Sequence, residues 1–255
     1  MPEYIGKEHR MANSTQEGIL DAAEEVFASH GYEGAGMRAI AKKANVNQAL
    51  LHYHFQTKDN LYETVVKRRS SAINRYRLEL LDQLYVNGRT PTLEELLYVL
   101  YAPSAYMRGG SVRTVAAYTQ MILAITIGSD ERSKALMAKY FDGIARRFID
   151  AFMQVQPELS RADAVWAYLF ALGARGQVHA RNDRAERLSG GLCDNKNLEE
   201  VAAVAVPFVA AGIRHLAKTG SKTSMSASRV TNVPLESREG RQSYPPSTRR
   251  KMQCD

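Results

Sequence analysis

The chain has 255 residues, 45% of them hydrophobic, and a formal net charge of +7. This length is enough for one large or two small domains with a hydrophobic core, and it excludes a small disulfide-stabilised peptide. The two cysteines, Cys193 and Cys254, lie far apart and indicate a reducing, cytoplasmic compartment. The longest apolar run, Val201 to Ile213, has 13 residues and is too short to span a bilayer, and the polar N-terminus carries no secretory signal.

The first part of the chain predicts an arm followed by two helices. Residues 1–13 indicate a loose N-terminal arm. Ser14 and Glu17 form a capping-box pattern that begins a helix, and Gly31 is suited to end it. A second, shorter helix is expected from Met37 to Ala44. The apolar face of the first helix is formed by Ile19, Ala23, Val26 and Phe27.

The segment Ala44-Asn45-Val46-Asn47 predicts a tight turn between two helices. Asn45 adopts the left-handed conformation at modest cost, and Asn47 is a good N-cap for the next helix. Val46 and Leu51 have the spacing of a hydrophobic staple, which sets the angle at which the second helix begins. Two helices joined in this way form a helix-turn-helix.

The helix from Asn47 to about Gln56 has an inner and an outer face. Leu51 and Phe55 are four residues apart and pack inward. The outer face offers an amide, a small residue and an aromatic hydroxyl, which together suit base edges and phosphates in a DNA groove. Thr57 caps the following helix, whose N-terminus and lysine predict a phosphate site. The predicted DNA contacts are Arg38, Asn47, Gln48, Ala49, Leu50, His52, Tyr53, His54 and Lys58.

Two alternatives for these residues are weaker. They could be ordinary surface residues, but the turn, the staple, the helical wheel and the caps all agree on one arrangement. His52 and His54 could bind a metal ion, but side chains two positions apart on a helix point in different directions, so no metal site is expected.

The distribution of charge along the chain fits DNA binding. Residues 1–33 hold two Lys/Arg and seven Asp/Glu, whereas residues 34–72 hold seven Lys/Arg and two Asp/Glu. A solvated basic face would look the same by charge alone.

The stretch AxxANVNQALLHYHFQTKDNLY is similar to the signature of the TetR family of bacterial regulators. Leu51, Tyr53, His54, Phe55 and Lys58 fall on the family's aromatic-rich recognition-helix end and the lysine after it. The upstream segment GILDAAEEVFASHGYEGAGMRAIA resembles the family's first two helices, so the likeness covers residues 15–70. There are two departures: Ala35-Gly36 stands where the family often has a Thr or Ser that contacts phosphate, and Asn45 replaces the usual turn glycine.

The rest of the chain predicts only helices. They are expected from Lys58 to about Tyr85, Leu93–Met107, Val112–Ile127, Asp130–Val155, Ser160 to about Arg181 and Leu198 to about Lys218, with a loop over 182–196 and a kink at Pro207. The expected fold is all-α: a three-helix helix-turn-helix domain over 14–60, joined by a long helix to a helical effector-binding and dimerisation domain over 61–218. Residues 219–255 form a basic segment, with seven Lys/Arg against three Asp/Glu, and predict a disordered tail.

The middle and last helices carry two further candidate sites. Bulky side chains with polar tips predict a small-molecule pocket, although any of them could be plain core. Small and apolar residues on the last two helices predict a dimer built as a four-helix bundle, which the family resemblance also implies; an intramolecular core is the alternative. The effector candidates are Tyr98, Tyr101, Arg113, Tyr118, Met121, Trp166, Phe170, Arg175 and His179. The dimer candidates are Leu169, Gly173, Val201, Ala205, Phe208, Val209, Gly212 and Leu216.

The motifs favour a regulator over an enzyme. HExxH, P-loop, GxSxG and paired-cysteine motifs are absent from the sequence, and no cofactor is expected. The resemblance implies a homodimer that binds a palindromic operator in double-stranded DNA and represses transcription until a small hydrophobic effector binds. The segments LGARG, LSGGLC and PFVAAG resemble a TetR subgroup tied to fatty-acid or aromatic catabolism, which implies a fatty acyl or aromatic effector. The alternative is a DNA-binding adaptor of the same fold controlled by a partner protein.

Overall fold

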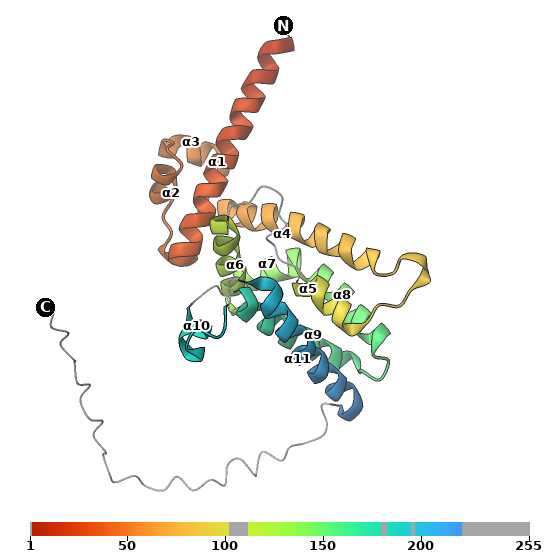
Figure 1. Ribbon diagram of the computed structural model, residues 1–255. Coiled ribbons are helices and arrows are strands. Elements are labelled where there is room, and N and C mark those ends of the chain that lie inside the picture. The colour runs from red at the N-terminus through yellow and green to blue at the C-terminus, as the bar shows by residue number, and fades with distance from the viewer. Residues whose placement is uncertain (1, 102–111, 180–182, 195–196, 221–255) are drawn as a thin grey trace, which may run out of the picture. The chain divides into compact units, whose positions relative to one another are not determined.

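The computed structural model describes the backbone of residues 2–101, 112–179, 183–194 and 197–220, and their side chains except those of residues 2–14, 112–117, 177–179 and 198. Every regular element within these ranges is a helix, which confirms the all-α fold class (Figure 1). The predicted tail, apart from its first two residues, lies outside the described residues, and so do the side chains of Arg113 and His179.

Helix α1 (Pro2–Gly34) begins earlier than the sequence indicates. The predicted arm over residues 1–13 continues the helix back to Pro2 rather than forming a separate coil. At the other end the prediction holds, because Gly31 has a positive φ of 67° and interrupts the helical backbone. The expected apolar face is buried, with Ile19 and Ala23 fully inaccessible to solvent.

The short helices α2 (Met37–Lys43) and α3 (Gln48–Phe55) lie beside α1, as Figure 1 shows. Ile40 from α2 and Leu51 and Phe55 from α3 are buried in the same hydrophobic cluster as the α1 face. Their burial explains the fixed arrangement of the three helices, since each apolar side chain removed from water contributes about 1.5–3 kcal/mol.

Helix α4 (Lys58–Gln83) is joined to α1 by a buried ion pair. Glu24 of α1 is fully buried, and its carboxylate accepts hydrogen bonds from Arg69 Nε at 2.8 Å and from Arg68 Nη2 at 3.0 Å. Burial raises the pKa of Glu24, and the two arginines oppose this rise. A buried charge needs such partners, so this contact favours one position of α4 against α1.

The remaining helices differ from the prediction at three places. A 3₁₀ turn (Val86–Gly88) precedes α5 (Leu93–Tyr101), and the rest of the helix expected to Met107 lies outside the described residues. The expected single helix from Asp130 to Val155 is two, because Phe141, with φ −125°, breaks it. The expected loop over 182–196 contains a short helix. These later helices are α6 (Val112–Ile127), α7 (Glu131–Tyr140), α8 (Asp142–Val155), α9 (Arg161–His179), α10 (Arg184–Ser189) and α11 (Leu198–Thr219).

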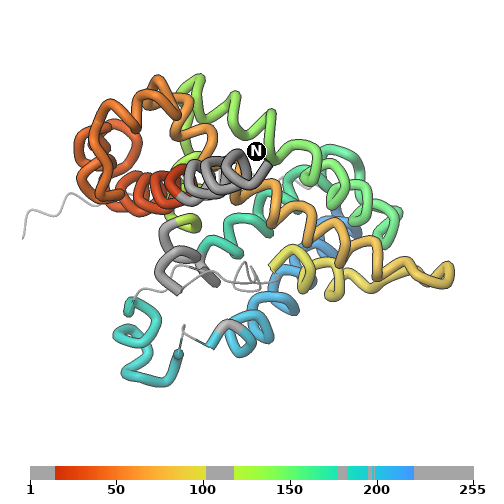
Figure 2. Tube along the Cα trace, turned by 90° about the horizontal axis from the view of Figure 1, so that it is seen from above, coloured from red at the N-terminus to blue at the C-terminus, as the bar shows by residue number. Residues whose placement is uncertain are grey.

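Two hydrophobic clusters account for the packing. The first joins α1, α2, α3 and the N-terminal half of α4 to α6 and α7. The second joins the C-terminal half of α4 to α5, α8, α9 and α11. Helix α6 therefore belongs to the core that supports the helix-turn-helix. Figure 2 shows the chain from above, with the red and orange N-terminal helices at one end. Residues 1–220 form one compact unit, so no gap in packing marks the predicted boundary at residue 60.

The last helix is longer than the apolar run seen in the sequence. Helix α11 continues through Pro207, and its segment Glu199–Thr219 is long and apolar enough to cross a membrane by length and composition. The fold offers another explanation for this composition. One side of α11 packs into the core through Val206, Ala210 and Ile213, and the opposite side is exposed. We therefore interpret α11 as a core helix with a second apolar face.

Candidate nucleic-acid interface and ligand cavity

The turn before α3 has the predicted geometry. Asn45 has a φ of 55°, which is the left-handed conformation. The Asn47 side chain accepts a hydrogen bond from the Leu50 backbone N–H at 2.7 Å and so caps α3. Val46 is half-buried and packs against the cluster that contains Leu51, as a hydrophobic staple requires. The sequence therefore predicted both the turn and the direction of the helix.

The outer face of α3 is open to solvent. Gln48, Ala49 and His52 are exposed, and Tyr53 is 79% exposed. The ring of His54 is half-buried and lies 5.3 Å from the Tyr53 ring, edge to face, so it supports Tyr53 more than it extends outward. Leu50 is half-buried at the flank. An exposed amide, hydroxyl and imidazole on a helix held by a buried inner face form a surface that can enter a major groove.

Two contacts along α3 orient its polar side chains. Gln48 Nε2 lies 3.5 Å from His52 Nε2, and His52 Nδ1 lies 3.0 Å from the Gln56 carbonyl oxygen. These contacts limit the rotamers of both side chains. A side chain that is already oriented loses less entropy when it binds a base edge.

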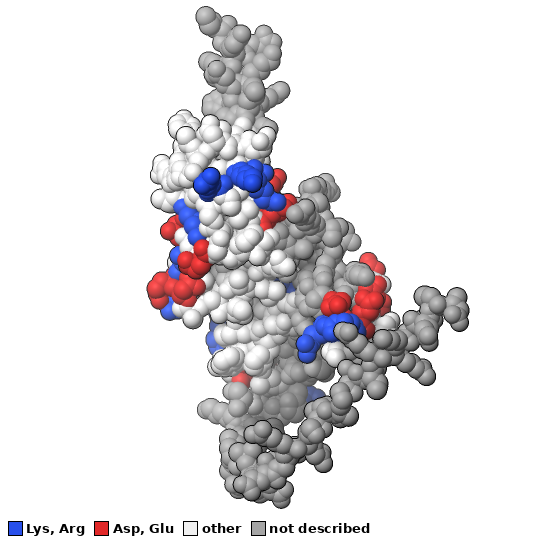
Figure 3. Space-filling model, turned by 90° about the vertical axis from the view of Figure 1, so that its left-hand side faces the viewer, with Lys and Arg blue, Asp and Glu red and all other residues white. Residues whose placement is uncertain are grey.

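The positive charge near this face comes from α2 rather than from α3. Arg38 is exposed, as predicted for a phosphate contact, and Lys42 is exposed near the end of the same helix. Lys43 pairs with Glu25 of α1 at 2.8 Å. Figure 3 shows Lys and Arg side chains on this side of the molecule, with acidic side chains beside and below them. The basic segment over 34–72 is therefore partly neutralised by α1.

Lys58 is engaged within the protein. Its Nζ donates to the Glu33 carbonyl oxygen at 3.3 Å and lies 4.3 Å from the centre of the Tyr32 ring. Its predicted contact with phosphate stays a prediction. The N-terminus of α4 is capped by Thr57, whose hydroxyl accepts from the Asn60 N–H at 3.1 Å.

Tyr32 connects the helix-turn-helix to α7, a role that the sequence did not indicate. The guanidinium carbon of Arg132 lies 3.4 Å from the Tyr32 ring centre, on a ring that Lys58 also contacts. The Tyr32 hydroxyl donates to Asp59 Oδ1 at 2.7 Å, and Arg132 Nε donates to the same oxygen at 2.9 Å. These bonds lower the pKa of Asp59, and burial together with the bond to Asp59 raises the pKa of Tyr32 to about 12.

Gly36 is the N-cap of α2 and has no side chain to cap it. Its φ of −106° suits any residue, and a Cβ there would meet nothing within 4 Å. We expect Gly36→Ser to stabilise the fold by about 0.3 kcal/mol through an N-cap bond. We also expect it to strengthen DNA binding by about 1 kcal/mol, because the hydroxyl restores the phosphate contact that the family resemblance implies. Gly36→Ala is the matched control, since it adds the Cβ without the hydroxyl. Equal DNA affinity of the two variants in a gel-shift titration would contradict this role.

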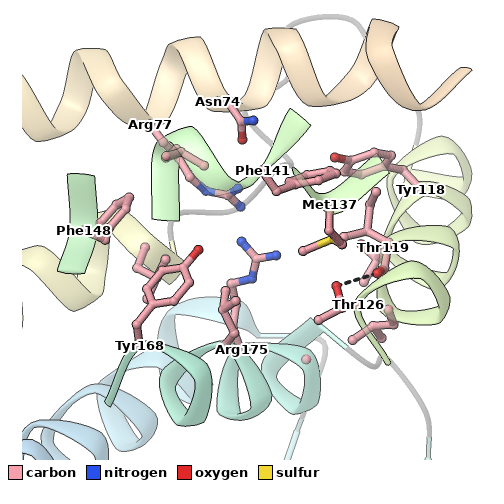
Figure 4. Close-up of a pocket in the computed structure, with 16 residues that line it drawn as sticks. Asn74, Arg77, Tyr118, Thr119, Thr126, Met137, Phe141, Phe148, Tyr168 and Arg175 are labelled. Atoms are coloured by element: carbon pink, nitrogen blue, oxygen red, sulfur yellow. Dashed lines mark hydrogen bonds between the residues drawn. The ribbon is translucent and has the colours of Figure 1, made fainter. Parts of the chain in front are cut away.

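A cavity of about 60 Å³ lies between the two hydrophobic clusters. Its walls come from α4, α5, α6, α8 and α9, with Met137 of α7 and Phe141 at the α7–α8 break. Figure 4 shows Arg77 reaching in from α4 and Arg175 from α9, with their guanidinium groups directed toward the same space. The hydroxyl of Tyr168 points into this space as well.

The structure brings two of the nine predicted effector residues to this cavity, Tyr118 and Arg175. Met121 and Tyr101 are buried in the two clusters outside its walls. Tyr98, Trp166 and Phe170 do not line this cavity, and their side chains are 49%, 52% and 66% exposed. Their predicted contact with an effector stays a prediction.

Sequence reasoning missed Arg77 and Asn74, the α4 residues that line the cavity. The leucines further along the same helix, Leu78, Leu81 and Leu84, pack in the second hydrophobic cluster and do not line the cavity. A signal was present: Ile73, Arg77 and Leu81 are spaced by four residues, so Arg77 interrupts an apolar stripe. A charged residue within such a stripe is a candidate for a functional site.

An exposed apolar face extends over α9 and α11. Trp166 and Phe170 stack with ring centres 5.7 Å apart, and Phe208 on α11 is 78% exposed. A groove of about 630 Å³ lies between the two helices. Of the predicted dimer residues, Leu169, Gly173, Phe208 and Gly212 are exposed, Val201, Ala205 and Leu216 are half-buried, and Val209 is buried at the floor of the groove. Trp166 and Phe170 belong to this face and do not line the cavity that contains Arg77 and Arg175.

A capped helix-turn-helix followed by a helical domain defines this protein as a member of the helix-turn-helix regulator class. Two family descriptions match the chain: residues 19–65 match the bacterial regulatory proteins of the tetR family, and residues 99–212 match the tetracyclin repressor-like C-terminal domain. The chain belongs to the TetR family of bacterial regulatory proteins, which are DNA-binding transcriptional regulators and not enzymes.

Curated relatives share the N-terminal part. The biofilm operon icaADBC negative transcriptional regulator IcaR of Staphylococcus aureus (strain Newman) is 43% identical over 49 residues, which cover 19% of this chain and 26% of IcaR. The transcriptional activator FasR of Mycolicibacterium smegmatis is 46% identical over 50 residues, covering 20% of this chain and 23% of FasR. The chain thus spans about a quarter of the length of these relatives.

A solved regulator shows a similar fold. The structure described as a putative transcriptional regulator from Pseudomonas aeruginosa PAO1 has a TM-score of 0.51 and 15% identity over 78% of this chain and 92% of its own. At this identity the likeness concerns the fold alone.

Proposed function

We propose that this protein is a cytoplasmic transcription repressor that binds a palindromic operator as a homodimer and leaves it when a small molecule enters the cavity. The observation that carries this proposal is the open outer face of α3, where Gln48, His52 and Tyr53 extend into solvent while Leu51 and Phe55 anchor the helix. Repression is the activity that the name of IcaR gives for that relative, and occupation of an operator that overlaps a promoter would produce it.

The homodimer is supported by the exposed face of α9 and α11. Exposed apolar surface of this kind, rimmed by polar residues, is typical of association sites. Pairing α9 and α11 with the same helices of a second copy would build a four-helix bundle about a two-fold axis. Such an axis places two α3 helices in symmetric positions, and binding in successive major grooves needs a separation of about 34 Å.

Ligand control is supported by the position of the cavity between the two clusters. One side of α6 lines the cavity through Tyr118 and Ile122, and α6 packs against α1 in the cluster that holds the helix-turn-helix. A ligand that favours one position of α6 would therefore also bias α1 and the recognition helix. Linkage then requires DNA and ligand to weaken each other's binding by the same factor. An adaptor controlled only by a partner protein would not need a cavity with charged walls.

The test begins with selection of bound sequences from a random DNA library, followed by gel-shift titration on the selected operator. We expect Gln48→Ala and Tyr53→Ala each to weaken operator binding by about 1–3 kcal/mol, because each removes a base or backbone contact. Glu79→Ala, at an exposed position on α4, is the control and should bind as the parent does. Parent-like affinity for both Gln48→Ala and Tyr53→Ala would refute the recognition surface.

A further inference from the structure

The cavity contains positive charge that no carboxylate of the described side chains pairs with. Arg77 is 7% exposed, and its Nε has no hydrogen-bond partner. Arg175 is half-buried and faces the same cavity (Figure 4). Among the described residues, no ion pair reaches either guanidinium group. The segments 102–117 and 177–182, whose side chains the structure does not describe, contain no Asp or Glu.

Two acids whose electrostatic fields reach the cavity walls are paired with other arginines. Glu24, whose field reaches Tyr118 in the cavity wall, is hydrogen-bonded to Arg68 and Arg69. Asp142, whose field reaches Tyr168, lies 3.6 Å from Arg146. Among the residues whose side chains are described, the carboxylates around the cavity therefore leave Arg77 and Arg175 uncompensated.

Two like charges that face one cavity, one buried and one half-buried, are costly without a counter-charge. Burial, followed by the repulsion from Arg175, lowers the pKa of Arg77 to about 9. Burial also lowers the pKa of Arg175. Arg77 still carries its proton at pH 7, because its pKa stays about two units above that pH. The cavity is thus positively charged at neutral pH and gains stability from an anion.

The cavity-lining side chains other than the two arginines indicate which chemical group is attached to the anion. Apart from Asn74, the tyrosine hydroxyls and two threonines, the side chains that line the cavity are apolar, among them Met137, Phe141, Phe148 and Leu172. An oxyanion can take hydrogen bonds from both guanidinium groups, which present fixed donor pairs. A cavity of 60 Å³ has room for a carboxylate and little more, so a larger apolar group would separate the helices around it.

We propose that this cavity binds the carboxylate of an organic acid between Arg77 and Arg175, with the apolar part of the acid against Met137, Phe141 and Phe148. The inference deepens the proposed ligand control and rests on it for its regulatory meaning. The carboxylate compensates one of the two positive charges and accepts hydrogen bonds from both guanidinium groups, and the apolar part of the acid shifts α6 relative to α4 and α9. Because α6 also packs against α1, this shift is the change that DNA binding would oppose.

The first experiment compares acids with their neutral counterparts on the full-length protein. The probes are the straight-chain carboxylates from acetate to dodecanoate, phenylacetate and 2-naphthoate, each paired with its primary amide, and decyl phosphate as a separate arm. Isothermal titration calorimetry measures each Kd. We expect at least one carboxylate to bind roughly ten- to hundred-fold more tightly than its amide, which is the usual value of hydrogen bonds to charged groups. Equal binding of acids and amides, no binding by any carboxylate, or binding by decyl phosphate alone would overturn the proposal.

The second experiment removes each charge while keeping the side-chain volume similar. Arg77→Met and Arg175→Met should each weaken binding of the best carboxylate by about ten-fold or more, whereas Arg161→Met, an exposed position on α9 paired with Asp150, should not. Without ligand, Arg77→Met should unfold at a temperature several degrees higher, because an uncompensated charge is removed. Unchanged carboxylate affinity in both cavity variants would overturn the proposal; if Arg77→Met does not fold, Arg175→Met and the acid–amide comparison decide.

Operator binding separates this inference from the proposed function. If a carboxylate binds through the two arginines but leaves operator affinity unchanged, the anion site stands and ligand control by this site fails. If instead a neutral amide releases the protein from its operator and the acids do not bind, the proposed regulation stands and the anion site fails.

Discussion

Phe55→Ala is expected to lower the free energy of unfolding by about 3–5 kcal/mol, the usual cost of truncating a buried phenylalanine. Phe55 is 1% exposed and shares a cluster with Leu51, Phe27 and Leu61, so alanine would leave a cavity beneath the recognition helix. Because α3 is anchored mainly by Leu51 and Phe55, the loss falls on the element that would read DNA. Urea denaturation followed by circular dichroism, at one fixed protein concentration, measures the change.

Tyr53→Ala is the matched control, since Tyr53 lies on the opposite face of the same helix and is 79% exposed. It should change stability by no more than about 0.5 kcal/mol while weakening operator binding. The pair thus separates folding from recognition within eight residues of helix. A stability loss of equal size in both variants would mean that the outer face of α3 is not free to bind DNA.

Phe208→Asp is expected to convert the dimer into a monomer. Phe208 is 78% exposed and lines the groove between α9 and α11, and a charge there would be buried without a partner in the proposed interface. Truncation of a central aromatic residue commonly costs 2 kcal/mol or more, and a buried carboxylate adds to this loss, so self-association should weaken by roughly 100-fold or more. Analytical ultracentrifugation measures the oligomeric state, and operator affinity should fall because a monomer contacts one half-site.

The control is Val86→Asp, which places the same charge on an exposed apolar residue of the turn before α5. It should remain dimeric and bind its operator normally. Circular dichroism should show full helicity for both variants, since neither residue is buried. A dimeric Phe208→Asp protein would refute the proposed interface.

The contacts around Tyr32 join α7 to the helices of the DNA-binding domain. Arg132 contacts both the Tyr32 ring and Asp59, and further along the same helices Tyr140 and Lys139 of α7 both donate to Glu63 of α4. Individually, exposed ion pairs contribute little. Here they join the end of α1, the start of α4 and the length of α7, so a displacement of α7 at the cavity would be transmitted to the base of the helix-turn-helix.

The DNA-reading unit could be predicted from the sequence because its determinants are local. A left-handed Asn45, the Asn47 cap and the Leu51–Phe55 spacing act within one or two helical turns, and each has the predicted geometry. The family signature lies in the same stretch. The all-α class follows from helical periodicity in the same way, since it needs no knowledge of which helices meet.

The cavity could not be predicted from the sequence, because it depends on contacts between segments that are far apart in the chain. Arg77 and Arg175 are 98 positions apart, and only the folding of α4 and α9 around one cavity directs them to the same space. An amphipathic pattern shows that one face of a helix is buried, but it does not show which other element that face packs against. Trp166 and Phe170 were therefore assigned to a pocket, although their face lies outside. Local sequence determined the helices and the recognition surface, whereas the tertiary structure decided which charged side chains are enclosed and which apolar face is left exposed.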